Sequence, residues 1–180
     1  MAAAEPWFIG ERAEALATMY LTRRQDLDVL PLPARARGDD LWVRLRDADH
    51  PNAHFLVEVK GILLSHPRSR QPVREQFPVR YTRRDLGDRD VPVCLFLFTV
   101  DDEQGYYRWL YEPVITQGHA RLRLDPRIDS LPPEERQRQQ VVVLSKFKPL
   151  DDGAIDTVVQ QVADWYATEP RHMLRRYAAT

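Results

Sequence analysis

The sequence has one cysteine, and no apolar run in it is long enough to cross a membrane. A single cysteine, Cys94, excludes an internal disulfide framework and a multi-cysteine zinc or iron–sulfur site. Its apolar neighbours predict a buried small side chain rather than a nucleophile. No apolar run approaches the roughly 20 residues that span a bilayer, and the first residues lack the basic and apolar parts of a signal peptide. We therefore expect a cytoplasmic protein with no membrane contact.

Excess charge of either sign is also missing. The chain has 26 basic and 27 acidic residues and a formal net charge of −1, so any contact with nucleic acid has to come from a local cluster. Hydrophobic residues make up 43% of the chain, which excludes disorder as a global description. A length of 180 residues leaves little room for a second core, so we expect one domain over residues 1–180.

Lysine is scarce. Only Lys60, Lys146 and Lys148 among the 26 basic residues are lysines. We interpret a lysine in such an arginine-rich chain as a position that needs a compact ammonium group with three rotatable donors and a tunable pKa. Lys60 is therefore the first candidate for a functional role.

Hydrophobic periodicity predicts a chain of strands between two helices. Apolar residues recur at offsets of three and four over residues 9–24 and again over 155–166, which is typical of amphipathic helices. On the first helix, Glu14 lies at the edge of the apolar stripe, whereas Glu11 faces water. Turn-forming residues bound the expected strands, which are 27–32, 40–46, 54–61, 91–100, 106–111, 120–124 and 140–145. We expect a long connection over 64–90, with a short helical turn near 81–86, and a terminal helix over 170–177.

Three charged residues in the second and third expected strands form the candidate site. The period of two in a strand places Glu58 and Lys60 on one face. An unpaired charge in a dry core costs several kcal/mol, so the two must pair with each other, reach water or bind an ion. Asp40 begins the neighbouring strand, and we prefer it to Asp39, which alternation places on the apolar side with Leu41.

Two carboxylates near a lysine favour a divalent cation. Mg²⁺ prefers oxygen ligands, and Asp40, Glu58 and the carbonyl of Val59 can supply part of an octahedron. Mn²⁺ is the alternative ion. Lys60 could orient or deprotonate a metal-bound water, and Glu14 could hold such a water from the helix side. The simpler interpretation is a cross-strand ion pair between Glu58 and Lys60 on a wet sheet face.

Three short motifs carry a resemblance to a known superfamily. They are Gly10-Glu-Arg-Ala-Glu14, Gly38-Asp-Asp40-Leu and Val57-Glu58-Val-Lys60-Gly61. Their order resembles that of the PD-(D/E)XK, or restriction-endonuclease-like, nuclease superfamily and, within it, the bacterial domain-of-unknown-function family 4365. The resemblance extends from about Ile9 to about Tyr111. The proline of the superfamily name is absent, because Gly38 and Asp39 precede Asp40.

The resemblance implies a fold and a set of roles. The fold would be an α/β restriction-endonuclease-like sandwich, with a central mixed sheet flanked by helices. Asp40 and Glu58 would be metal ligands, Lys60 the catalytic lysine and Glu14 the helix acid. The activity would be Mg²⁺- or Mn²⁺-dependent endonucleolytic hydrolysis of DNA in a bacterial defence or mobile-element system. A protein partner or a homo-oligomer would supply target recognition.

Two other functions stay open. The chain could be a catalytically silent scaffold or subunit that keeps the nuclease fold, or a metal-dependent phosphoesterase acting on RNA or nucleotides. Six arginines after the third expected strand could track a phosphate backbone or simply form a solvated loop; they are Arg68, Arg70, Arg74, Arg80, Arg83 and Arg84. Four aromatic residues could stack on bases, although packing is the commoner role of aromatics in strands; they are Trp42, Tyr106, Tyr107 and Trp109.

Overall fold

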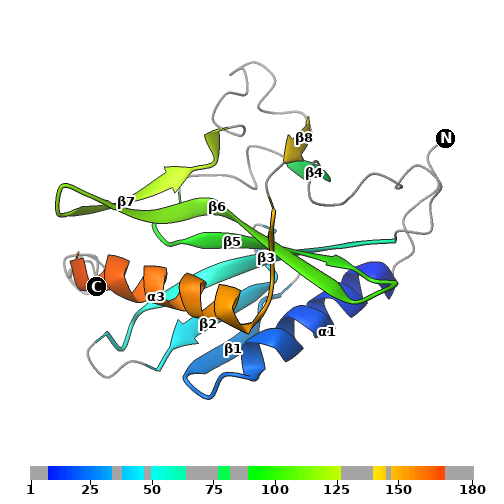
Figure 1. Ribbon diagram of the computed structural model, residues 1–180, viewed down its shortest axis with the longest axis horizontal. Helices are drawn as coiled ribbons and strands as arrows, with labels where there is room; N and C mark the ends of the chain where they lie inside the picture. Colours follow the sequence, from blue (N-terminus) through cyan, green and yellow to red (C-terminus); the bar gives the residue numbers. More distant parts are fainter. Residues whose placement is uncertain are drawn as a thin grey trace.

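Strands dominate the chain between two helices (Figure 1). The computed structural model describes residues 8–33, 38–46, 50–63, 77–81, 89–126, 140–144 and 147–168. The elements are α1 (Phe8–Thr22), β1 (Leu27–Pro31), β2 (Leu41–Leu45), β3 (His54–Ile62), β4 (Phe77–Tyr81), β5 (Val93–Thr99), β6 (Gln104–Thr116), β7 (His119–Leu124), β8 (Gln140–Leu144), β9 (Lys148–Pro149) and α3 (Asp152–Thr168).

The main sheet is mixed and open. Its order is β1-β2-β3-β5-β6-β7, and the short β9 pairs with β6. β3 and β5 are parallel, whereas every other pairing in this sheet is antiparallel. β4 and β8 form a separate antiparallel ribbon. An α/β fold with a mixed sheet, as expected from the sequence, is therefore confirmed.

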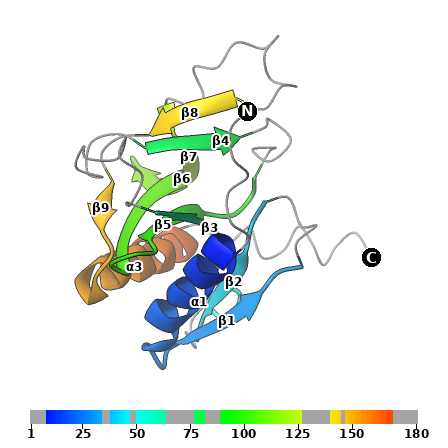
Figure 2. The ribbon, with the colours of Figure 1, turned by 90° about the vertical axis from the view of Figure 1, so that its right-hand side faces the viewer.

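Both helices pack against the same face of the sheet, which we call the helix face. Its core includes Leu16 of α1, Val57 of β3, Phe96 of β5 and Val162 of α3. The opposite face, here the second face, has a smaller apolar cluster around Leu95, Leu97 and Leu110. The β4–β8 ribbon lies on the side of the sheet away from the helices, near β6 rather than β1 (Figures 1 and 2).

Most of the expected elements are confirmed, with bounds that differ by a few residues. Within β2, the alternation of buried Leu41, Val43 and Leu45 agrees with the expected apolar face. Cys94 is fully buried, as predicted. At the start of α3, the backbone N–H of Ala154 donates to Oδ1 of Asp151 at 2.8 Å, the capping contact that satisfies an otherwise orphaned donor. Among the described residues, neither helix is long and apolar enough to span a membrane.

The predicted connection over 64–90 is wrong in one part. Residues Phe77–Tyr81 form β4, which pairs with β8 more than 50 residues further along the chain. A strand that is ordered by a partner so distant in sequence leaves only a weak local signal, and Pro78 weakens the strand pattern further. Tyr81, where a helical turn was expected, belongs to this strand. The rest of that turn and the helix expected over 170–177 lie outside the described residues.

Gly61 lets α1 approach β3 closely. A Cβ built on Gly61 would lie 2.7 Å from both Cγ2 and the carbonyl oxygen of Ile9, and 3.1 Å from Cβ of Ala13. Such contacts are too short for real carbon atoms, so a side chain here would push the helix away from the strand. This glycine therefore sets the distance between α1, which carries Glu14, and β3.

We expect Gly61→Ala to destabilise the protein by about 1–3 kcal/mol, the usual effect of overpacking a close contact. Urea unfolding followed by circular dichroism measures this change. Gly10→Ala is the matched control, because nothing lies within 4 Å of a Cβ at that position. Alanine is the better helix former, so the control should be stabilised by up to about 1 kcal/mol. Equal stability of the two variants would contradict the close approach.

Candidate active site

Asp40 stands immediately before β2 and extends its pairing with β3. Its backbone N–H donates to the carbonyl of Val57 at 2.9 Å, and its side-chain Oδ2 accepts the backbone N–H of Val59 at 2.6 Å. The carboxylate of Asp40 thus accepts the Val59 N–H in place of the backbone carbonyl that a longer β2 would offer. Burial raises the pKa of Asp40, while the hydrogen bond from Val59 and the charge of Lys60 oppose the rise. Asp40 is therefore fixed at the point where β2 begins.

Glu58 and Lys60 lie side by side on the second face of β3. Lys60 Nζ is 2.9 Å from Glu58 Oε1, and the side chains are 37% and 9% exposed. Burial raises the pKa of Glu58 to about 7; the charge and hydrogen bond of Lys60 act against this rise, and Asp40 and Asp39 add to it. The ion pair weighed as the simpler interpretation is present. Its carboxylate is buried, unlike that of an ordinary surface pair, while the lysine side chain stays partly exposed.

Glu14 joins this group from α1. Its side chain is exposed, but partial burial raises its pKa, Asp40 and Glu11 raise it further, and Lys60 lowers it. These influences place Glu14 within electrostatic reach of both Asp40 and Lys60. The structure therefore brings Asp40, Glu58 and Lys60 to one corner, where β2 begins beside the middle of β3, and Glu14 of α1 acts on Asp40 and Lys60 only through its charge.

The oxygen atoms at this corner suit a hard divalent cation. Asp40 and Glu58 each keep one carboxylate oxygen that is not used in the contacts described above. In an extended strand, the N–H and C=O of one residue point to the same side. Since the N–H of Val59 meets Asp40, its carbonyl also points toward the β2 side. Within the described ranges, however, no three carboxylate, imidazole or thiol groups lie close enough to form a ready-made metal-binding group. Asp40, Glu58 and the Val59 carbonyl offer oxygen donors, the ligand type that Mg²⁺ prefers while it keeps several of its waters.

Asp39 is held by an arginine that the sequence did not single out. Arg89 Nη1 lies 2.6 Å from Asp39 Oδ2, and the side chains are 7% and 5% exposed. Gly38, with φ of 82°, forms the turn just before this pair. Asp39 is thus engaged by Arg89, and the preference for Asp40 over Asp39 as a ligand stays a prediction. Position 89 has no local motif, and only the tertiary fold brings it to Asp39.

The proposed DNA-contacting arginines fall mostly outside the described residues. Arg80 lies in β4, within the β4–β8 ribbon. The other five, which stay untested, are Arg68, Arg70, Arg74, Arg83 and Arg84.

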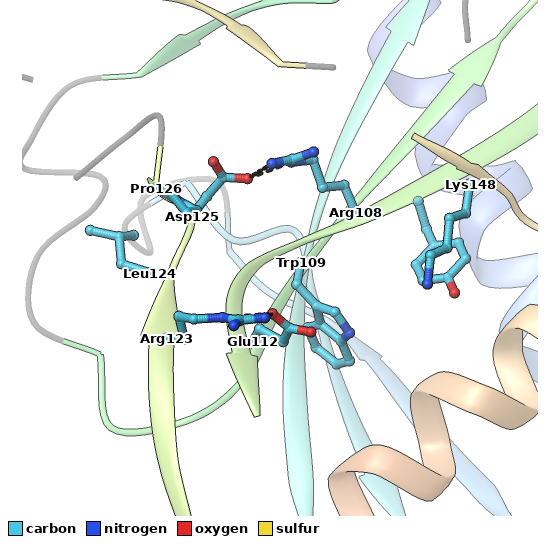
Figure 3. A pocket seen from close by; sticks show the side chains of 9 residues that line it. Arg108, Trp109, Glu112, Arg123, Leu124, Asp125, Pro126 and Lys148 are labelled. Atoms are coloured by element: carbon cyan, nitrogen blue, oxygen red, sulfur yellow. Dashed lines mark hydrogen bonds and ion pairs between the residues drawn. The ribbon is translucent and has the colours of Figure 1, made fainter. Parts of the chain in front are cut away.

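Two of the four aromatic candidates have packing roles. The indole N–H of Trp109 donates to Gln161 of α3 at 3.0 Å, and Tyr107 is only 4% exposed. Both line a hollow of about 330 Å³ between β6, β7 and β9 (Figure 3). Charged side chains in this hollow pair with each other, as Arg108 does with Asp125. We therefore assign Trp109 and Tyr107 to the packing of the sheet rather than to base stacking.

The raised pKa of Glu58 predicts a pH-dependent stability in the presence of a chelator. The folded chain keeps this proton until about pH 7, whereas the unfolded chain releases it near the ordinary value of 4.5. The folded state thus binds more protons between these values, and the free energy of unfolding falls as the pH rises through this range. Glu58→Gln cannot ionise, so relative to the parent chain it should gain on the order of 3 kcal/mol between pH 4.5 and pH 8.

Urea unfolding at the two pH values measures this gain. Glu11→Gln, on the water-facing side of α1, controls for the loss of a surface carboxylate. The same difference between Glu58→Gln and the parent at both pH values would contradict a buried carboxyl that titrates near neutrality.

Comparison with known proteins gives no relative. No family model matches the chain, and no curated protein or solved structure is significantly similar to it.

Proposed function

We propose that the chain is a metal-dependent nuclease that hydrolyses DNA phosphodiester bonds. The observation that carries this proposal is the meeting of Asp40, Glu58 and Lys60 at one end of the β2–β3 hairpin, with Glu14 in electrostatic reach. A partly buried lysine beside two carboxylates with raised pKa values is a typical arrangement for metal-assisted hydrolysis, and an unusual one for a purely structural sheet.

The order of the elements supports a restriction-endonuclease-like fold. A helix precedes the antiparallel β1-β2-β3 unit, and β5 then adds in parallel to β3. Asp40 stands at the start of the second strand, and Glu58 and Lys60 lie within the third, as the motifs of the superfamily require. The absence of any significant match leaves the chain's own residues to support this assignment.

Each residue at the corner has a chemical role. Asp40, Glu58 and the Val59 carbonyl would hold Mg²⁺ or Mn²⁺, which when bound neutralises phosphate charge and acidifies water. Lys60 Nζ orients the attacking water or donates to a phosphate oxygen as negative charge develops there. Glu14 accepts a hydrogen bond from a water on the helix side. Displacement of Lys60 from Glu58 would free both groups for these tasks.

From the same resemblance we propose that the activity belongs to the bacterial cytoplasm, in a defence or mobile-element system. DNA is the proposed substrate. A protein partner or a second copy of the chain would select the target, because the sheet and its two helices use most of the described residues.

Incubation of the purified chain with supercoiled plasmid tests the proposal. We expect nicking in Mg²⁺ or Mn²⁺ and none in a chelator. Asp40→Asn should abolish nicking and weaken Mn²⁺ binding measured by calorimetry. Asp164→Asn, an exposed carboxylate on α3, is the matched control and should change neither.

Three outcomes would contradict the proposal. Metal-independent nicking, or nicking that survives Asp40→Asn, would show that another site or a contaminant cleaves. Cleavage of RNA or nucleotides alone would favour the phosphoesterase. Absence of both Mn²⁺ binding and cleavage would favour the silent scaffold.

A further inference from the structure

The second face of β1 and β2 carries a half-buried tryptophan and an exposed leucine next to two arginines. Leu30 and Trp42 are cross-strand partners, as are Asp28 and Arg44. These four residues and Arg46 line a hollow of about 740 Å³ at this edge of the sheet. We call this set of five residues the β1–β2 surface. It lies away from the β4–β8 ribbon (Figure 2).

One carboxylate serves both arginines on this surface. Arg44 Nε donates to Asp28 Oδ2 at 3.0 Å, and Arg46 Nε donates to Asp28 Oδ1 at 2.6 Å. The two guanidinium groups lower the pKa of Asp28, so the trio has one excess positive charge at neutral pH. The arginine side chains are 46% and 58% exposed, which leaves part of each fork open to a phosphate.

Trp42 stands between these arginines and the candidate active site. The guanidinium carbon of Arg44 lies 5.8 Å from the centroid of the indole ring. Leu30 is the cross-strand partner of Trp42 and is 54% exposed, which is unusual for a large apolar side chain beside a tryptophan. The His54 ring lies 5.5 Å from the Trp42 ring, centroid to centroid. An aromatic ring beside a guanidinium group is the combination that single-strand-binding surfaces use, with bases on the ring and phosphates on the cations.

Strand geometry connects this surface to the site. Asp40, just before β2, and Trp42 and Arg44 within it occupy alternate positions, so successive side chains are about 7 Å apart on one side of the strand. Arg44 therefore lies on the order of 14 Å from Asp40 along the strand. A few nucleotides span that distance.

We propose that the β1–β2 surface binds single-stranded nucleic acid and leads it to the corner formed by Asp40, Glu58 and Lys60. Arg44 and Arg46 contact the backbone, and a base stacks against Trp42. Only the direction of the strand toward that corner rests on the proposed nuclease function; the binding itself stands on the half-buried Trp42 ring and the exposed arginine side chains.

Fluorescence anisotropy in a chelator tests binding without cleavage. The probes are a labelled oligothymidine, the matching oligouridine and a duplex of equal length. Trp42→Leu keeps an apolar partner for Leu30 and should weaken binding of the single strand by about five- to a hundredfold. Arg44→Gln with Arg46→Gln should also weaken it and reduce the salt slope by about 0.7 for each phosphate that the variant no longer neutralises.

A double variant at the opposite edge controls for charge. Arg121→Gln with Arg123→Gln on β7 removes the same two charges and should leave affinity unchanged. Circular dichroism confirms that each variant is folded. The oligouridine shows whether the surface accepts RNA as well as DNA.

Two results would overturn the inference. One is unchanged single-strand affinity in both β1–β2 variants. The other is tighter binding of the duplex than of the single strand, with a duplex affinity that Trp42→Leu does not change. The plasmid assay is scored separately. Single-strand binding that depends on this surface, combined with no cleavage in any metal, would retain the inference and reject the nuclease. Metal-dependent cleavage, combined with normal single-strand binding by the β1–β2 variants, would retain the nuclease and reject the inference.

Discussion

Lys60→Ala should slow metal-dependent DNA cleavage by between about a hundredfold and ten thousandfold, the usual range for a group that assists proton transfer or charge stabilisation. The reason is geometric. Lys60 Nζ is 2.9 Å from Glu58 Oε1, and the charge of Lys60 acts on both proposed ligands, Asp40 and Glu58. Single-turnover cleavage at saturating Mn²⁺ measures the chemical step.

Folding should survive this substitution. Without Lys60, Glu58 can take up a proton, since burial already raises its pKa to about 7. Lys148→Ala, which removes an exposed lysine beside the Tyr107 ring, is the matched control and should cleave normally. Lys60→Arg separates two roles, because arginine keeps the charge but cannot act as a base. Full activity of Lys60→Ala in a folded protein would remove this lysine from the mechanism.

Arg89→Met should destabilise the protein by about 3–5 kcal/mol. The substitution leaves Asp39, only 5% exposed, as a buried carboxylate without its guanidinium partner. Loss of one member of a buried pair is costly because the remaining charge keeps its desolvation penalty. Asp39 directly precedes Asp40, so weaker Mn²⁺ binding should accompany the loss of stability. Urea unfolding and calorimetry measure the two effects.

A double-mutant cycle isolates the pair. Asp39→Asn combined with Arg89→Met should cost less than the sum of the two single changes, because the second change removes the stranded charge. Arg12→Met breaks the exposed pair with Glu103, whose side chains are 50% and 54% exposed, and should cost no more than about 1 kcal/mol. Similar losses of unfolding free energy for Arg12→Met and Arg89→Met would mean that burial does not determine the cost of breaking the Asp39–Arg89 pair.

The sequence predicted the local elements well because their signals are local. The period of two in β2 and the helical stripe of α1 come from residues a few positions apart. The strand β4 was missed because its partner β8 is distant in sequence, and no nearby pattern announces such a pairing. The same reason explains Arg89, whose role exists only through Asp39, 50 residues away.

The properties of the candidate site also divide into those that the local sequence determines and those that need the tertiary structure. The sequence by itself determined that Glu58 and Lys60 share a strand face, since alternation is a property of any extended chain, and that Asp40 lies where the neighbouring strand begins. Only the tertiary structure decided that Glu58 is buried enough to hold a proton near neutral pH, that Asp40 accepts the N–H of Val59, and that Glu14 reaches this corner. The position of Glu14 depends on the packing of α1 against β3, where Gly61 sets the spacing, whereas the contact of Asp40 with Val59 depends on the pairing of β2 with β3. Burial of this kind results from contacts between segments that the chain order keeps apart.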